Sequence, residues 1–263
     1  RSIKSISDEV KLLSQKGAKE IVFLGQNVNA YNDKSNNNDA KLSDLIRAIS
    51  EFDSVKRIRY TTSHPINMDE ELIQEHKNNM KLMPFLHLPV QSGSESILKK
   101  MNRKYDPDFY RRTIDRLKKA KPDIEISSDF IVGYPGETDQ DFNDTLKLID
   151  DIEFTQSYSF IYSSRPGTKS STEVDNTPIS VKKERLLVLQ EKLKKIQYSF
   201  NNEFCNKTVK VLIENQSSSN PEYFFGRTPF MQSVYIKSND LVPGHEKDID
   251  ITSCNHKSLY GTC

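Results

Sequence analysis

The fold of this chain is decided by two stretches, HLPVQSGS at residues 87–94 and DFIVGYPGET at residues 129–138. In each stretch an apolar run breaks into glycine and small polar residues just before a helix is expected. A parallel β-strand delivers a binding loop in this way, because its carboxyl end presents backbone N–H groups and hydroxyls to a ligand. The two loops therefore predict one ligand site that is assembled from several strand ends.

Strand-like and helix-like patterns alternate on both sides of these stretches. Amphipathic helices separate the expected strands, which are continuous apolar runs, as in sheets covered on both faces. Parallel strands require such crossovers. An α/β fold is therefore expected, with a partial (β/α) barrel whose five parallel strands lie near residues 21–24, 57–62, 85–90, 124–132 and 158–162. The Asn-rich segment 32–39 between the first two strands is expected to be an exposed loop.

The pattern changes after Phe200, where short alternating strands replace the βα units. Apolar and polar residues alternate from Val209 onward, and turn sequences such as residues 217–221 separate the later strands. This pattern is typical of a small antiparallel β-barrel. The sequence thus predicts two domains, a core at residues 1–200 and a C-terminal barrel at residues 201–263.

The composition excludes several classes of protein. The chain has 263 residues and a net charge of +1. It contains no run of about 18 apolar residues that could span a membrane. No signal peptide opens the chain, and its three scattered cysteines predict neither a disulfide framework nor a metal site, so a cytoplasmic protein is expected. An N-terminus at Arg1 without a Met suggests a fragment, a processed chain or a trimmed one.

Polar side chains at the strand ends are the candidate binding groups, and each has a structural alternative. Gln26 and Asn27 could bind a ligand through donor and acceptor groups, or could form a polar turn. Residues 91–94 could cradle a ligand, cap the next helix, or do both. Residues 133–137 suit a tight turn. Asp129 begins a buried run where an unpaired carboxylate would be costly, which favours a ligand or an ion-pair partner for it.

Basic and aromatic residues suggest two places for RNA contact. The helix expected at residues 181–200 carries a net charge of +4, which fits either a solvated face or contact with an RNA backbone. The C-terminal part has six Lys/Arg against seven Asp/Glu. RNA binding there would therefore depend on shape, on Arg227 and on rings such as Tyr223 and Phe224.

With these residues assembled, the chain resembles the radical S-adenosylmethionine (SAM) methylthiotransferases of the MiaB type. The tail, including GRTPF at 226–230, resembles their RNA-binding TRAM domain, and five further stretches match in family order, at residues 24–31, 62–65, 87–94, 129–138 and 162–168. The resemblance implies an enzyme that methylthiolates C2 of N6-isopentenyladenosine at position 37 of tRNA. It also implies SAM as cofactor, tRNA as partner, a reductant protein, and a monomeric enzyme.

One departure from the family is large. The family holds a [4Fe–4S] cluster through a CxxxCxxC triad and carries a second cluster in an N-terminal domain. Neither segment occurs in this sequence, and Cys205, Cys254 and Cys263 cannot replace the triad. The chain thus resembles an N-terminally truncated methylthiotransferase that lacks its first strand and cluster loop. This piece alone is expected to bind no metal and to be inactive.

The resemblance further implies that the strand ends form the wall of a SAM pocket. The expected cofactor-binding residues are Gln26, Asn27, Ser63, Gln91, Ser92, Gly93, Ser94, Asp129, Gly133 and Tyr162. No catalytic residue is assigned. Three alternatives stay open: a methylthiotransferase acting on threonylcarbamoyl-adenosine in tRNA, a barrel enzyme of another class, and a non-catalytic RNA-binding remnant. The second would need a catalytic lysine at a strand end, and none is found there.

Overall fold

The computed structural model describes residues 1–35, 39–167, 169–173, 175–218, 220–238 and 240–263. Parts of three expected segments lie outside these ranges: residues 36–38 of the Asn-rich loop, Thr168 of the 162–168 stretch, and Ser219 of the 217–221 turn. The ends of the Asn-rich segment are not simple loop. They pair as β2 (Asn32–Asp33) and β3 (Ala40–Lys41), and a buried Asp33 carboxylate accepts the Ile3 N–H at 2.7 Å.

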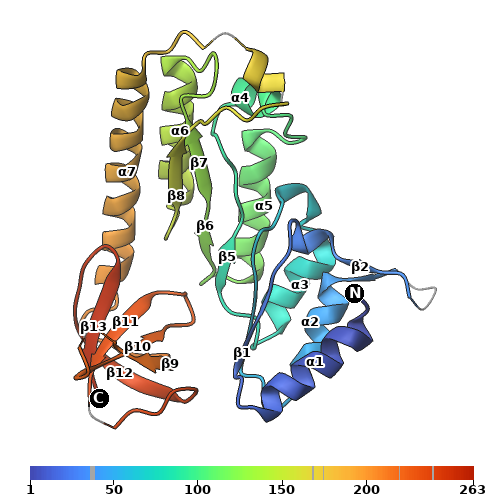
Figure 1. Cartoon of the computed structure of the whole chain (residues 1–263), viewed down its shortest axis with the longest axis vertical. Helices are drawn as coiled ribbons and strands as arrows, with labels where there is room; N and C mark the ends of the chain where they lie inside the picture. Colours follow the sequence, from blue (N-terminus) through green and yellow to red (C-terminus); the bar gives the residue numbers. More distant parts are fainter. Residues whose placement is uncertain (36–38, 168, 174, 219, 239) are drawn as a thin grey trace.

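The core is an open sheet built from β1 (Glu20–Phe23), β4 (Arg57–Tyr60), β5 (Phe85–His87), β6 (Glu125–Ser127), β7 (Asp129–Val132) and β8 (Tyr158–Ile161). β1 pairs with β4, β5 with β6, and β7 with β8, all in parallel. Parallel bridges from Ile58 to Leu82 and from Gln91 to Phe130 connect these pairs. The expected parallel core is therefore confirmed (Figure 1).

The single strand expected at residues 124–132 is wrong, because the segment breaks at Ser128 into β6 and β7. The Ser128 N–H bonds the Ser157 Oγ at 3.2 Å, and the Ser128 Oγ accepts the Val90 N–H at 2.9 Å. These side-chain bonds replace regular ladder bonds at this point. The segment changes its main partner here, from β5 to β8.

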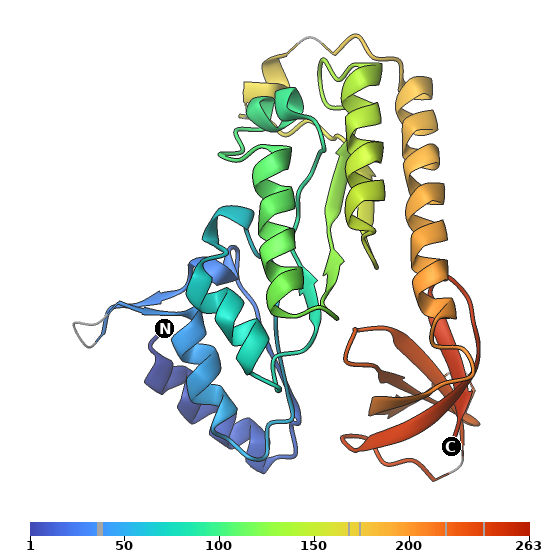
Figure 2. The same ribbon diagram turned by 180° about the vertical axis from the view of Figure 1, so that it is seen from behind.

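Helices cover the outer face of the sheet and leave its inner face open (Figures 1 and 2). Each crossover buries an apolar stripe; in α5, for example, Tyr110, Ile114 and Leu117 are buried. The helices are α1 (Ile3–Gln15), α2 (Leu42–Ser50), α3 (Glu70–Asn78), α4 (Glu95–Lys100), α5 (Pro107–Ala120), α6 (Asp139–Ile152) and α7 (Ile179–Asn202). None of these described helices combines the length and apolar character needed to cross a membrane.

The two faces of the sheet differ in chemistry, and β7 shows the difference. Phe130 and Val132 are buried in the core cluster that packs against the helices. Asp129 and Ile131 alternate with them, so they point to the concave inner face. Their strand neighbours on that face are Tyr158 and Phe160 of β8. The inner face therefore carries the polar and aromatic groups that are available to a ligand.

The C-terminal barrel contains β9 (Thr208–Gln216), β10 (Tyr223–Arg227), β11 (Ser233–Lys237), β12 (Glu246–Cys254) and β13 (Ser258–Thr262). It closes in the order β10-β11-β13-β12-β9. The expectation of an antiparallel barrel is wrong at one pair, because β11 and β13 are parallel. A closed ring with an odd number of strands cannot alternate direction throughout, so a five-stranded barrel must contain a parallel pair.

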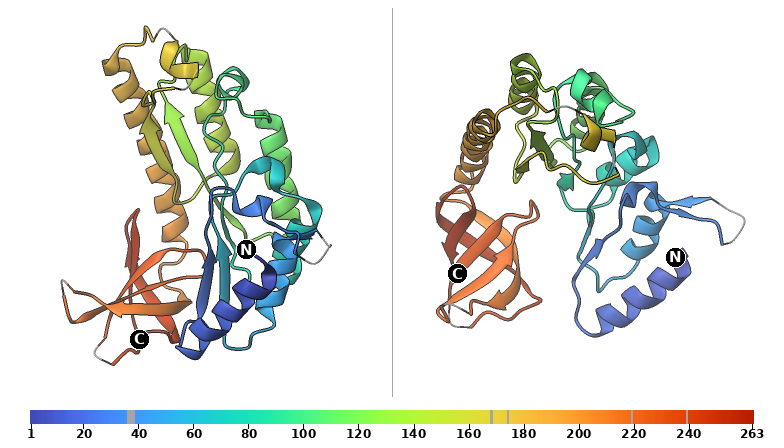
Figure 3. Two further views of the ribbon diagram at one scale, coloured as in Figure 1. Left: turned by 45° about the vertical axis from the view of Figure 1, so that its right-hand side comes forward. Right: turned by 45° about the horizontal axis from the view of Figure 1, so that its top comes forward.

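The barrel has a hydrophobic core of its own, which includes Val211, Val234 and Ile249. α7 ends at Asn202, and β9 begins at Thr208. The barrel lies beyond the carboxyl end of α7, beside the end of the sheet where β1 and β4 begin (Figure 3). The strand ends that carry the candidate site lie at the opposite end of the sheet.

Candidate cofactor site on the concave face

A pocket opens on the concave face at β7, β8 and the chain after β5. Three of the expected site residues, Gln91, Asp129 and Tyr162, line this pocket. The other lining residues are Ile131, Phe160, Ile161, Ser163, Arg165 and Ser170. The structure thus brings together a carboxylate, an amide, a phenol and an apolar wall. Such a mixture suits a ligand with charged, polar and aromatic parts.

Asp129 lies on the concave face beside His87. The Asp129 Oδ2 is 3.5 Å from the His87 Nε2, and the Asp129 side chain is 30% exposed. The other ring nitrogen of His87 lies 3.0 Å from the Ser127 Oγ, which orients the imidazole. The position expected for Asp129 near Gln91 is confirmed. Its expected proximity to Asn27 is not, because Asn27 lines a different pocket.

Gln91 occupies a strained position at the edge of this pocket. Its φ of 75° lies in the left-handed region, which is uncommon for a residue other than glycine. Its N–H donates to the Asp129 carbonyl and its carbonyl accepts the Ile131 N–H, both at 2.9 Å. These two bonds to β7 hold the backbone of Gln91 in place. Strain of this kind is concentrated at functional sites.

Ser92, Gly93 and Ser94 join helices instead of lining the pocket. The Ser92 Oγ and the Gly93 N–H both lie within hydrogen-bond distance of the Thr145 Oγ1 in α6, at 3.2 and 3.0 Å. The Ser94 side chain caps α4 and donates to Asp141 at 2.5 Å. The helix-capping alternative for this stretch is therefore confirmed. A direct cofactor contact from these residues stays a prediction.

Replacing Gly93 with alanine should destabilise the fold. A Cβ at this position would lie 2.5 Å from the Asp144 carbonyl oxygen and 2.6 Å from the Thr145 Cα, and neither backbone atom can move away easily. We expect Gly93→Ala to lower the free energy of unfolding by roughly 2–3 kcal/mol. Denaturant unfolding measures this loss. In the control Gly25→Ala, the new Cβ would meet only a Val28 methyl at 3.2 Å, so an equal loss in both variants would contradict the packing argument.

The loop at residues 133–138 is shaped by local bonds. Gly133 and Gly136 have φ values of 69° and 74°, which explains why glycine stands at both positions. The Glu137 carboxylate accepts the Gly133 N–H at 3.0 Å and pairs with Arg185 of α7 at 2.7 Å. Burial raises the pKa of Glu137, while these two partners oppose the rise. The Thr138 and Asp141 side chains form a capping box at the start of α6.

The remaining expected residues lie on the β1 side of the sheet. Gln26 and Asn27 are exposed, and the Asn27 amide donates to the Asn67 Oδ1 at 2.9 Å. Ser63 is buried, and its Oγ has no hydrogen-bond partner among the described residues. A buried hydroxyl in this state is normally satisfied by water or a ligand. These residues are separate from the pocket that contains Gln91 and Asp129.

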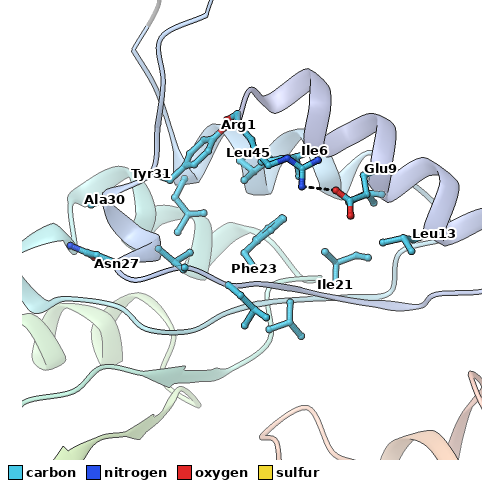
Figure 4. A pocket seen from close by; sticks show the side chains of 16 residues that line it. Arg1, Ile6, Glu9, Leu13, Ile21, Phe23, Asn27, Ala30, Tyr31 and Leu45 are labelled. Carbon is cyan, nitrogen blue, oxygen red and sulfur yellow. Dashed lines mark hydrogen bonds and ion pairs between the residues drawn. The ribbon is translucent and has the colours of Figure 1, made fainter.

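A second pocket lies between α1, α2 and β1 (Figure 4). Ile6, Ile21, Phe23 and other apolar residues line most of it, and Asn27 lies at one end. The Arg1–Glu9 ion pair, 2.6 Å long, lies at its rim. β4 is the only strand that pairs with β1 in the described ranges, so this pocket runs along an open sheet edge.

Two aromatic residues of the concave face were missed by sequence reasoning. Tyr158 and Phe160 of β8 are 61% and 55% exposed, although such rings are usually buried. The sequence does indicate an aromatic face, because Tyr158, Phe160 and Tyr162 are spaced two residues apart along one strand and therefore share a face. Tyr162 also has a buried hydroxyl without a partner in the described parts of the chain.

The residues of this chain do not fit an iron–sulfur cluster. Cys205 and Cys254 are half-buried in the C-terminal barrel region, and Cys263 is exposed near the end of β13. Across the described ranges, no group of three or more His, Cys, Asp or Glu side chains is placed to hold a metal ion. A polar ligand fits the concave pocket better, because Asp129, Gln91 and Tyr162 line it.

Comparison with known proteins gives a consistent assignment. The model of the radical SAM superfamily matches residues 1–149. The chain is 48% identical to a tRNA-2-methylthio-N(6)-dimethylallyladenosine synthase of Rickettsia bellii, over 99% of this chain and 59% of that protein. The corresponding protein of Rickettsia conorii is 47% identical over the same shares. The chain thus spans about three fifths of the length of these relatives.

A solved structure supports the same fold. Coproporphyrinogen III oxidase of Escherichia coli, a radical SAM enzyme, superposes with a TM-score of 0.57 over 86% of this chain and 59% of its own. The two sequences are 13% identical, so this likeness concerns the fold alone. The parallel core, its open concave face and a family match over more than half of the residues lead to one conclusion: the chain belongs to the radical SAM superfamily.

Proposed function

We propose that this chain is the core and C-terminal part of a radical SAM methylthiotransferase. Its substrate would be N6-isopentenyladenosine, also called N6-dimethylallyladenosine, at position 37 of tRNA, and C2 of the base would receive the methylthio group. The observation that carries this proposal is the 48% identity, over 99% of the chain, to a synthase of this name. The chain would act in the cytoplasm, as a monomer, with tRNA and a reductant protein as partners.

The concave pocket is the proposed place for SAM. When bound, SAM supplies radical chemistry and a methyl group, and the protein binds, orients and shields it. Asp129 and Gln91 would accept or donate hydrogen bonds to its polar groups, and Phe160 would cover an apolar part. Ser63 and Tyr162 each have a buried hydroxyl without a partner in the described chain, and of the two only Tyr162 belongs to a residue that lines this pocket. Gln26, Asn27 and Gly133 do not line this pocket, so they would contact SAM only where the ligand extends beyond it along the neighbouring strand ends.

In this proposal the ligands of the cluster come from outside residues 1–263. The relatives are longer than this chain, and the chain offers no suitable set of ligands in its described ranges. Methylthiolation is therefore proposed for the complete protein, and residues 1–263 alone should be inactive.

The C-terminal barrel is proposed to be a TRAM-like RNA-binding domain, with the boundary near Asn201. Phe225, Tyr235 and Tyr260 form a row of half-buried rings on neighbouring strands, with centroids 5.5 and 5.8 Å apart. Such rings can stack on bases without sequence preference. Phe224 cannot serve in this way, because it is buried inside the barrel. This corrects the sequence expectation for that residue.

The proposal is tested with the purified complete protein, SAM and a reductant. We expect methylthiolation of tRNA that carries N6-isopentenyladenosine at position 37, and none of tRNA that carries threonylcarbamoyl-adenosine there. Mass spectrometry of the digested nucleosides measures both products, and unmodified tRNA is the control. A product formed from the threonylcarbamoyl substrate alone would replace this proposal with its nearest alternative.

A further inference from the structure

The core holds one turn of the C-terminal barrel through the backbone of that turn. Arg57 Nη1 donates to the Arg227 carbonyl at 2.8 Å, and Arg59 Nη2 donates to the Thr228 carbonyl at 3.1 Å. Gln156 Nε2 donates to the Phe230 carbonyl at 3.0 Å. Two side chains of β4 and one from the chain just before β8 therefore donate hydrogen bonds to three carbonyls of the segment 227–230. We call this segment the clasped turn.

The two arginines are almost completely buried. The side chains of Arg57 and Arg59 are 2% and 4% exposed. Burying a guanidinium group is costly unless it is paired. Arg59 pairs with Glu20 of β1 at 3.0 Å, whereas Arg57 pairs with Glu246 of the C-terminal barrel at 2.8 Å. Glu246 is the only carboxylate of the described residues that pairs with Arg57, so the Arg57 charge is compensated while the barrel is in place.

The clasped turn is held rigid from its own side as well. The Thr228 Oγ1 accepts the Phe230 and Gln232 N–H groups at 3.2 and 3.3 Å. The Gln232 amide donates to Asn201 of α7 at 2.9 Å. The Phe230 ring packs against Phe200 and Phe204 near the end of the same helix. The three carbonyls are thus presented to the core in a fixed geometry.

The clasped turn overlaps the GRTPF stretch at 226–230, which contains Arg227, one of the residues on which RNA binding by this part was expected to depend. The structure points elsewhere. The Arg227 guanidinium pairs with Glu214 at 3.0 Å and lies over the Phe225 ring, so its partners belong to its own barrel. Its carbonyl faces Arg57 of the core. The stretch therefore joins the two parts of the chain.

We propose that Arg57, Arg59 and Gln156 are positioning residues that fix the orientation of the C-terminal barrel relative to the concave pocket. RNA held by the barrel would then present its target base at the other end of the sheet. The presentation of the target base rests on the proposed function, whereas the fixed orientation of the barrel rests on the contacts alone. No other described ion pair joins the core sheet to the barrel. Loss of the Arg57–Glu246 pair should therefore loosen the attachment of the barrel to the core.

The first test measures orientation directly, in the complete protein. The variant Arg57→Met/Glu246→Gln removes both charges and so leaves no buried unpaired carboxylate. Gln156→Ala removes a single bond and is the milder variant. Small-angle X-ray scattering should show a broader distribution of interatomic distances for both variants, and more so for the first. The control Arg116→Met breaks a surface pair with Glu70, far from the barrel, and should leave the curve unchanged.

The second test separates positioning from simple stability. In the reconstituted variants, RNA-free cleavage of SAM should persist, and the KM for tRNA should stay close to its normal value. The kcat for methylthiolation should fall by roughly tenfold or more, since small misplacements of a substrate have effects of this size. A merely structural role would lower SAM cleavage and tRNA turnover in the same proportion.

Three outcomes would overturn the inference. An unchanged scattering curve in both variants would show that these residues do not fix the barrel. A raised KM for tRNA with normal kcat would make them part of the RNA-binding surface. A proportional loss of both reactions would reduce them to a stabilising role. If the complete protein modified no tRNA at all, the proposed function would fail, whereas the scattering test of the clasped turn would still stand.

Discussion

Disrupting the gene for the complete protein should remove every 2-methylthio group from isopentenylated tRNA and leave the isopentenyl group in place. The reason is chemical order, because the proposed reaction uses the isopentenylated base as its substrate. Nucleosides from total tRNA, separated by liquid chromatography and identified by mass spectrometry, measure both modifications. The expected change is a complete loss of one nucleoside and a matching gain of its precursor.

Complementation supplies the control for this disruption. The complete gene should restore the 2-methylthio group, and residues 1–263 alone should not, because the described chain has no suitable set of cluster ligands. A tRNA nucleoside profile that stays normal while a ribosomal protein loses a methylthio group would assign the chain to a different methylthiotransferase.

Changing Asp129 to asparagine in the complete protein should lower the methylthiolation rate roughly tenfold to a hundredfold. A hydrogen bond to a charged group contributes about 1.5–3 kcal/mol, which corresponds to this range. The substitution keeps the shape of the side chain and removes its charge on the concave face. Stability should change little, because the carboxylate is 30% exposed and its distance to His87 is 3.5 Å. Initial rates at varied SAM concentration and thermal melting measure the two effects.

A matched variant shows whether the position matters or only the charge. Asp108 is a highly exposed carboxylate on the outer surface, where it pairs with Arg111 at 3.1 Å. Asp108→Asn should leave the rate unchanged. If Asp129→Asn behaved in the same way, the residue would be a structural partner of His87 and the proposed SAM contact would be wrong.

The sequence predicts the helices and most strands because each buries a regular apolar pattern. It could not predict the break at Ser128, since the polar run Ser127-Ser128-Asp129 does not show that the Ser128 side chain will replace ladder bonds. The sequences of β10 and β13 could not be recognised as strands, because apolar and polar residues do not alternate clearly in them. In each, a glycine packs against a neighbouring backbone: a Cβ on Gly226 or Gly261 would lie 2.5 or 2.6 Å from a carbonyl oxygen.

The candidate site was harder to predict than the fold. Position at a strand end identified Gln91 and Tyr162, and the cost of an unpaired buried carboxylate identified Asp129; all three line one pocket. The same rule also selected Ser92 and Ser94, whose hydroxyls are used by helices. Whether a strand-end side chain faces a ligand or a helix depends on residues far along the chain, such as Thr145 and Asp141. A local pattern carries no information about those partners.

The core recognises the clasped turn by its carbonyls, and every amino acid carries the same carbonyl. Side chains that do not shape the turn can therefore change through evolution while the joint is kept, whereas Thr228 and Phe230, which fix the path of its backbone, cannot. Arg57 and Arg59 cannot change in the same way, because a guanidinium group donates its hydrogen bonds in a fixed planar geometry. The core therefore binds a backbone shape and not a particular set of side chains. Barrels with different outer surfaces, and so with different RNA preferences, could be exchanged on one unchanged core.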